Sequence, residues 1–252
     1  MTDNNSTTPA LAETTSLSAQ QASIWVTLFI AVFLVFAPSI LIGALFGLYG
    51  HFTKVEPFQH WFASIDVQLM LMALSLPLAG YFVILFTRFF NHAKSIEQIY
   101  KYLHIKPVGY KEACTWIVLS TAVWGAIATF GIVADLPEEA FMIMIRDSAT
   151  SSLLVVLVVC VLAPIVEELI FRGLIFKRFQ QSILASSGAA VMTCLTFTLI
   201  HAQQYSLTGL FIIFIIAAYL TWIRLKTNNT SLAIVAHATN NILSTIALYF
   251  LL

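Results

Sequence analysis

Long uninterrupted apolar runs constrain this chain more than any other feature of its sequence. Hydrophobic residues make up 60% of the 252 residues, whereas charged residues make up only 10%. A soluble domain carries about 25% charged residues, so this chain has too few to cover a surface that faces water. Because the runs are continuous rather than alternating, they predict an all-α, polytopic helical membrane protein. The formal net charge is zero, and nothing in the sequence suggests a nucleic-acid partner.

Seven apolar stretches are each close to the ~20 residues that a helix needs to cross a bilayer. A polar tail at 1–22 precedes them and is predicted to be disordered. The segment 23–149 is expected to form the N-terminal membrane helices, with a basic cytoplasmic loop at 91–113 that predicts an interfacial helix and leaves room for an eighth, short segment. The segment 150–252 is expected to form a catalytic core of four membrane helices. The predicted spans are roughly 23–49, 67–90, 114–134, 150–176, 184–203, 207–225 and 231–251.

The basic residues lie mostly at one set of span ends. Ten of the twelve lysines and arginines fall there, and only Lys54 and Arg146 fall at the other ends. Because cytoplasmic loops carry the excess of basic residues, we predict a cytoplasmic amino terminus and an outside carboxyl terminus. The ten residues are Arg88, Lys94, Lys101, Lys106, Lys111, Arg172, Lys177, Arg178, Arg224 and Lys226.

The fourth predicted span contains three charges, in the stretch "APIVEELIFRGLIF". Glu168 and Arg172 are four residues apart, so they share a helix face and predict an ion pair. Glu167 points about 100° away and has no local partner, and unpaired carboxylates in membranes usually face an interior cavity. The alternative is a structural salt bridge in which Arg172 extends to the headgroups. Pro164 removes a hydrogen bond from the carbonyl of Cys160, which predicts a kink where water enters.

Two further polar clusters follow in the fifth and seventh spans. In "FTLIHAQQ", Phe197 and His201 are one helical turn apart, and in "VAHATNN", His237 and Asn241 are four residues apart. Either cluster alone is typical of a structural histidine or of hydrogen bonds between helices. A rise of ~1.5 Å per residue puts Glu167 about 15 Å from the inner end of its span, His237 about 10 Å and His201 about 20–25 Å, so the depths agree only in part.

Together these side chains suit the hydrolysis of a peptide bond. A carboxylate and a histidine can deprotonate a water molecule, and an imidazole and an amide can donate hydrogen bonds to the oxyanion that forms at a carbonyl. The same atoms also allow a zinc site, with Glu167 or Glu168, His201 and His237 as ligands and an open fourth position. The zinc-protease signature His-Glu-x-x-His is absent.

The three motifs, in this order on consecutive apolar spans, resemble those of the CAAX-processing and bacteriocin-processing (CPBP, or Abi) family of intramembrane endopeptidases. That family includes the type II CAAX prenyl endopeptidases. The motifs are Glu-Glu-x-x-x-Arg at Glu167–Arg172, Phe-x-x-x-His at Phe197–His201 and His-x-x-x-Asn at His237–Asn241. The resemblance covers roughly residues 150–252 and implies that these spans close a polar, water-filled intramembrane cavity.

The resemblance also implies a role for each motif residue. Glu167 is expected to activate water with His201 as its partner, and His237 and Asn241 are expected to form the oxyanion hole. This glutamate-type mechanism needs no cofactor and is favoured over the zinc-dependent form. The expected catalytic residues are Glu167, His201, His237 and Asn241, and the expected supporting residues are Glu168, Arg172 and Phe197.

The expected substrate is a peptide or protein at the membrane, and the expected location is a bacterial inner membrane. Two other functions remain open. The chain can be a non-catalytic membrane immunity or scaffold protein of the same family, or a proton-coupled transporter, since buried Glu and His also build proton relays. The sequence contains no visible internal repeat of the kind that many transporters have.

Overall fold

The computed structural model describes residues 22–54 and 57–250, and every regular element within these ranges is a helix. The predicted polar tail, 1–22, lies outside the described residues except for Ala22. The helices are α1 (Ile24–Thr53), α2 (Phe58–Ala63), α3 (Ile65–Asn91), α4 (Ile96–Leu103), α5 (Tyr110–Val133), α6 (Ala140–Ser148), α7 (Ser152–Val155), the π-helical η1 (Val156–Leu162), α8 (Ala163–Glu168), the π-helical η2 (Leu169–Ile175), α9 (Phe176–Gln180), α10 (Ala185–Ile200), α11 (Leu207–Thr227) and α12 (Thr230–Phe250).

The chain is an integral membrane protein, and the described residues contain six helical stretches that are long and apolar enough to span a bilayer. These are α1, α3, α5, the continuous stretch Ser152–Gln180, α11 and α12. The predicted span at 184–203 corresponds to α10, which has only 16 residues. At ~1.5 Å per residue α10 is about 24 Å long, shorter than the ~30 Å hydrocarbon core. It ends because His201 leaves the helical conformation, with φ −91° and ψ 0°.

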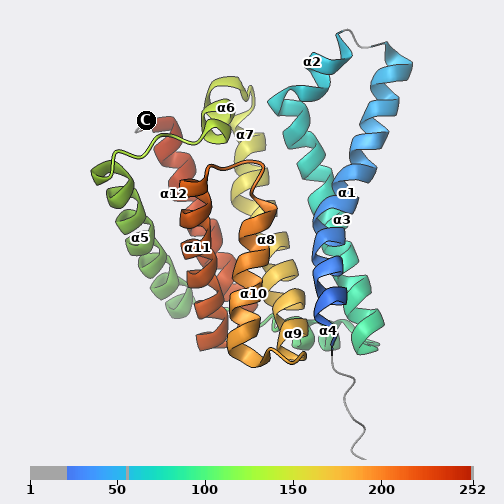
Figure 1. Cartoon of the computed structure of the whole chain (residues 1–252), viewed down its shortest axis with the longest axis vertical. Helices are drawn as coiled ribbons and strands as arrows, with labels where there is room; N and C mark the ends of the chain where they lie inside the picture. The colour runs from blue at the N-terminus through green and yellow to red at the C-terminus, as the bar shows by residue number, and fades with distance from the viewer. Residues whose placement is uncertain (1–21, 55–56, 251–252) are drawn as a thin grey trace, which may run out of the picture.

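The long helices run up and down one bundle, as Figure 1 shows. In that view α1 begins at one end of the bundle and α12 finishes at the opposite end. α12 packs against α5, α10 against α11, and α1 against α3. This arrangement agrees with an odd number of passes through the bundle. Which end faces the cytoplasm stays a prediction.

The basic loop contains the short helix α4, which fixes the beginning of α12. At the carboxyl end of α4, the carbonyl of Leu103 accepts a hydrogen bond from Thr230 Oγ1 at 2.6 Å, and the carbonyl of His104 accepts one from Thr230 N at 2.9 Å. The free carbonyls at the end of α4 therefore accept hydrogen bonds from the first residue of α12. This contact positions α12, the helix that carries His237 and Asn241.

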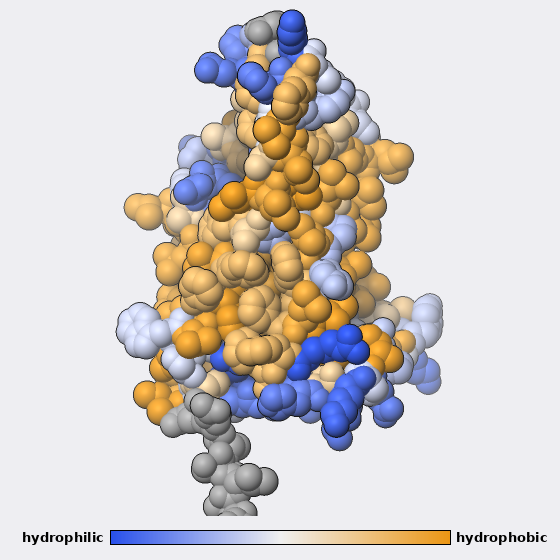
Figure 2. All heavy atoms as spheres, turned by 90° about the vertical axis from the view of Figure 1, so that its right-hand side faces the viewer, coloured by the Kyte–Doolittle hydropathy of each residue, from blue (hydrophilic) through white to orange (hydrophobic). Residues whose placement is uncertain are grey.

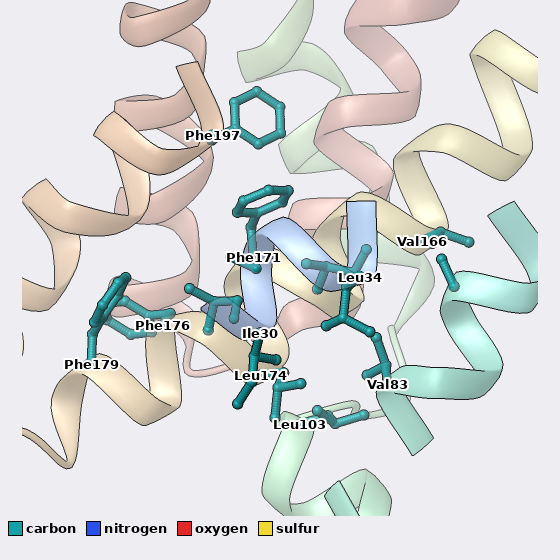
Figure 3. Packing of buried hydrophobic residues seen from close by; sticks show 14 of the residues in the cluster. Ile30, Leu34, Val83, Leu103, Val166, Phe171, Leu174, Phe176, Phe179 and Phe197 are labelled. Carbon is teal, nitrogen blue, oxygen red and sulfur yellow. The ribbon is translucent and has the colours of Figure 1, made fainter. Parts of the chain in front are cut away.

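The largest apolar core lies where α1, α3, α4, η2, α9 and α10 meet (Figure 3). At its upper edge in that view, Phe171 points from η2 toward Phe197 of α10, with ring centroids 5.1 Å apart and planes at 84°. This contact with Phe171 holds Phe197 in place at the edge of the core.

The outer face seen in Figure 2 is apolar through its middle and polar at both ends, as expected for a surface that meets lipid.

Candidate active site

Both glutamates lie on α8, a six-residue α-helical turn between the π-helical segments η1 and η2. In a π-helix each N–H donates to the carbonyl five residues earlier, as it does at the end of η1. In that register Pro164, which has no N–H, leaves the carbonyl of Val159 without a backbone donor. Asn241 replaces the missing bond, since its Nδ2 donates to the Val159 carbonyl at 2.8 Å. The sequence analysis predicted that Pro164 frees the carbonyl of Cys160, which would hold only in an α-helical register.

Glu168 and Arg172 form the predicted ion pair, with Nη1 2.8 Å from Oε1 and both side chains fully buried. Arg172 also donates to the carbonyl of Ala217 at 2.9 Å and to Thr221 Oγ1 at 3.4 Å. Its guanidinium lies 4.6 Å from the centre of the Phe197 ring. The alternative in which Arg172 extends to the headgroups is therefore wrong. Additional hydrogen bonds of this kind are what make a buried charge pair tolerable.

His237 connects this pair to the second glutamate. Its Nδ1 lies 2.9 Å from Glu168 Oε1, and its Nε2 lies 3.9 Å from Glu167 Oε2. A carboxylate paired with Arg172 can only accept hydrogen bonds, so Nδ1 carries a proton, and Nε2 presents a lone pair whenever the ring is neutral. Glu167 keeps 20% of its side chain exposed, whereas Glu168 has none exposed. The accessible carboxylate is therefore the one without an arginine partner.

His201 stands at the end of α10 and is held in a similar way. Its Nδ1 lies 2.8 Å from the carbonyl of Phe197. Because a carbonyl only accepts, Nδ1 is the donor, and Nε2 again presents a lone pair whenever the ring is neutral. The Phe197 ring lies 4.8 Å from the ring of His201 and 6.1 Å from that of His237, centroid to centroid. Phe197 therefore packs against both imidazoles.

Glu167, His201, His237, Asn241 and Phe197 all line one cavity of about 320 Å³, bounded mainly by apolar side chains. The depth of Glu167 is larger than the sequence estimate because its helical stretch continues to Gln180. At ~1.5 Å per residue, Glu167 lies about 20 Å from that end, close to the ~24 Å of His201 from the start of α10. The two side chains can therefore meet at one depth.

A second cavity, of about 390 Å³, shares Glu167 and His201 with the first. Residues of α1, α3 and η2 and of the turn after α10 line it. Glu167 and His201 therefore border both cavities.

Zinc chemistry would require several ligands around one point. Within the described residues, no group of three or more His, Cys, Asp or Glu side chains is placed so that it could hold a metal ion. Glu167, His201 and His237 therefore line the cavity without forming a metal-ligand set. The residues present do not fit the zinc alternative in this arrangement.

The sequence analysis did not single out two further residues of the first cavity, Tyr205 and Glu139. Tyr205 follows His201 by four residues, a spacing that would have been a usable signal, and their ring centroids are 6.2 Å apart. Glu139, in the loop before α6, accepts hydrogen bonds from Ser206 N at 2.9 Å and Ser206 Oγ at 2.6 Å. No local sequence pattern indicates that contact, because Glu139 and Ser206 are 67 positions apart.

A comparison with protein families adds an independent observation. Residues 149–243 match the family model described as type II CAAX prenyl endopeptidase Rce1-like. The matched segment begins three residues before α7, ends within α12 and contains every motif residue from Glu167 to Asn241. No curated protein and no solved structure matches the chain.

Proposed function

We propose that the chain is an intramembrane endopeptidase in which Glu167 activates a water molecule. The match of residues 149–243 to the Rce1-like type II CAAX prenyl endopeptidase model supports this proposal, because that family implies an intramembrane protease. One observation carries the proposal. A partly exposed carboxylate and the free nitrogens of two fixed imidazoles border the same cavity, and this cavity lies between membrane helices.

The nucleophile is a water molecule held between Glu167 and His237. The 3.9 Å between Glu167 Oε2 and His237 Nε2 is too long for a direct hydrogen bond, and both atoms can accept a hydrogen bond from the same water. Glu167 takes a proton from the water while the oxygen of that water attacks the peptide carbonyl. When the C–N bond breaks, Glu167 returns that proton to the leaving amine. The acyl carbon keeps the OH, and the carboxylate is regenerated.

The oxyanion requires donors, and this requirement separates the roles of His237 and Asn241. With Nδ1 committed to Glu168, neutral His237 offers a lone pair, so we assign it to the water rather than to the oxyanion hole. Asn241 uses one of its two amide hydrogens on the carbonyl of Val159 and retains one for the oxyanion. His201, with its free Nε2, is assigned to proton transfer beside Glu167.

Glu168, Arg172 and Phe197 act as positioning residues in this scheme. Glu168 fixes the ring of His237, and Arg172 balances the charge of Glu168. The carbonyl of Phe197 orients His201, and the ring of Phe197 packs against both imidazoles. Support of this kind keeps reactive groups in place before substrate arrives.

The test is cleavage of a peptide library by purified protein in proteoliposomes, CAAX-type peptides included. Glu167→Gln should lower kcat/KM by about 10²–10⁴-fold, the usual contribution of a general base. Glu97→Gln, which changes an exposed carboxylate on α4, should cleave like the wild type. If Glu167→Gln and the wild type cleave equally fast, Glu167 is not the base.

The same assay separates the alternative functions. Activity that persists with a strong zinc chelator supports the glutamate-type mechanism, whereas loss that added zinc restores favours the metal-dependent form. A wild-type protein that is folded and cleaves no peptide in the library would favour the immunity or scaffold function.

A further inference from the structure

The site has fewer hydrogen-bond donors than the chemistry requires. The N–H groups of both imidazoles are already bonded, to the carbonyl of Phe197 and to Glu168. Asn241 has one amide hydrogen left, because the other is bonded to the carbonyl of Val159. Oxyanion holes commonly present two donors, so a second one is expected along the same cavity wall.

Tyr205 offers such a donor. It lines the cavity beside His201, and its ring packs 6.1 Å from the ring of Phe141, centroid to centroid. Among the described residues, the only hydrogen-bond partner of its hydroxyl is the thioether of Met142, at 4.0 Å. A thioether sulfur is a weak acceptor, so the phenolic O–H is available to a stronger one. The ring is fixed while the donor remains free.

The turn that carries Tyr205 is held by the next residue. Ser206 caps the start of α11 by accepting from Gly209 N at 3.1 Å, and both its N–H and its hydroxyl donate to Glu139. A carboxylate at the start of a helix is also favoured by the helix dipole. Gly209 leaves the space that Glu139 occupies, because a Cβ at Gly209 would collide with Glu139 Oε1. Glu139 thereby fixes the backbone next to Tyr205.

We propose that the hydroxyl of Tyr205 donates a hydrogen bond to the oxyanion of the tetrahedral intermediate, opposite Asn241, and is a further catalytic residue of this site. The proposal rests on the proposed protease function. The pKa of Tyr205 is raised to about 12 by burial and by the negative charges of Glu167 and Glu139. The phenol consequently keeps its proton at every pH at which a membrane protease works. The carboxylates that surround it thus preserve its ability to donate.

The test removes only the hydroxyl. Tyr205→Phe keeps the ring packed against Phe141 and His201, and it should lower kcat by about 10–10³-fold with KM nearly unchanged, because the bond forms only as negative charge develops. Tyr249→Phe is the matched control, since the hydroxyl of Tyr249 has no hydrogen-bond partner among the described residues and Tyr249 does not line the cavity. The second measurement is inhibition by a peptide phosphonate, which mimics the oxyanion and should bind Tyr205→Phe more weakly by the same factor.

Each outcome has a distinct meaning. If wild type and Tyr249→Phe cleave, Glu167→Gln does not, and Tyr205→Phe matches the wild type in kcat and in phosphonate affinity, the inference is overturned while the protease function stands. A fall in kcat together with an equal rise in KM, and no change in phosphonate affinity, indicates a packing role and also overturns it. If Glu167→Gln cleaves as fast as the wild type, the proposed function fails and the inference fails with it.

Discussion

Glu168 of α8 and His237 of α12, 69 positions apart in the chain, are joined by a buried hydrogen bond of 2.9 Å between Oε1 and Nδ1. The same oxygen accepts from Arg172 at 2.8 Å, so one carboxylate atom fixes both an arginine and an imidazole. Glu168 therefore connects the charge balance of the interior to the geometry of the site.

Glu168→Gln should destabilise the protein, whereas Glu167→Gln should not. The first change leaves the buried guanidinium of Arg172 without a counter-ion, which costs about 3–5 kcal/mol. The second affects a carboxylate that is 20% exposed and that accepts no hydrogen bond from the described part of the protein, since His237 Nε2 lies 3.9 Å away. Thermal unfolding in detergent measures both. Equal melting temperatures for the two variants would contradict the assigned roles.

Asn241 and Pro164 should be energetically coupled. Asn241→Leu leaves the partly buried carbonyl of Val159 without a donor, at a cost of about 1 kcal/mol or more. Pro164→Ala restores a backbone N–H that can bond to the same carbonyl, so the asparagine change should cost less in that background. A double-mutant cycle of unfolding free energies should show a coupling of about 1 kcal/mol. Strict additivity would show that the two residues do not share this carbonyl.

Gly209→Ala should lower activity without unfolding the protein. The added methyl group displaces the carboxylate of Glu139, which releases Ser206 and shifts Tyr205. We expect kcat to fall about tenfold or more, since small displacements of positioned groups are costly in catalysis. Gly125→Ala, where a Cβ would contact nothing within 4 Å, is the control and should keep full activity. Unchanged cleavage by Gly209→Ala would mean that the Glu139 contact does not position the site.

Stability should decrease as the pH falls toward 4, in part because of His104. Its pKa is lowered from 6.5 to about 4 by burial and by the charges of Arg224, Lys177 and Lys106. Between these two values the unfolded chain binds a proton that the folded chain does not, so folding is progressively less favourable as pH falls. His104→Gln should reduce the loss of melting temperature between pH 7 and pH 5. An identical loss in this variant would exclude the contribution of His104.

The sequence revealed those parts of the site that follow from spacing within one helix. The Glu168–Arg172 pair needs only a shared helix face, and it was confirmed at 2.8 Å. The all-helical membrane fold followed from apolar runs alone and was likewise confirmed. The catalytic roles assigned to the motif residues stay predictions.

Contacts between distant segments could not be found in this way. The bond from Asn241 to Val159 depends on a π-helical register, and hydropathy does not distinguish that register from an α-helical one. The contact between Glu139 and Ser206 depends on how a loop folds back over the start of α11. Both are consequences of tertiary packing, which no local pattern encodes.

The widened turns on either side of α8 make this stretch sensitive to its length. Each N–H of η1 reaches one residue further back than in an α-helix, so deleting one residue and restoring α-helical pairing would leave Glu167 on nearly the same face. Deleting a residue while the wide turn is kept would instead rotate Glu167 by about a quarter turn, and an aliphatic neighbour would then face the hollow. Related chains should therefore lose a residue from Val156–Leu162 only where the wide turn is lost with it.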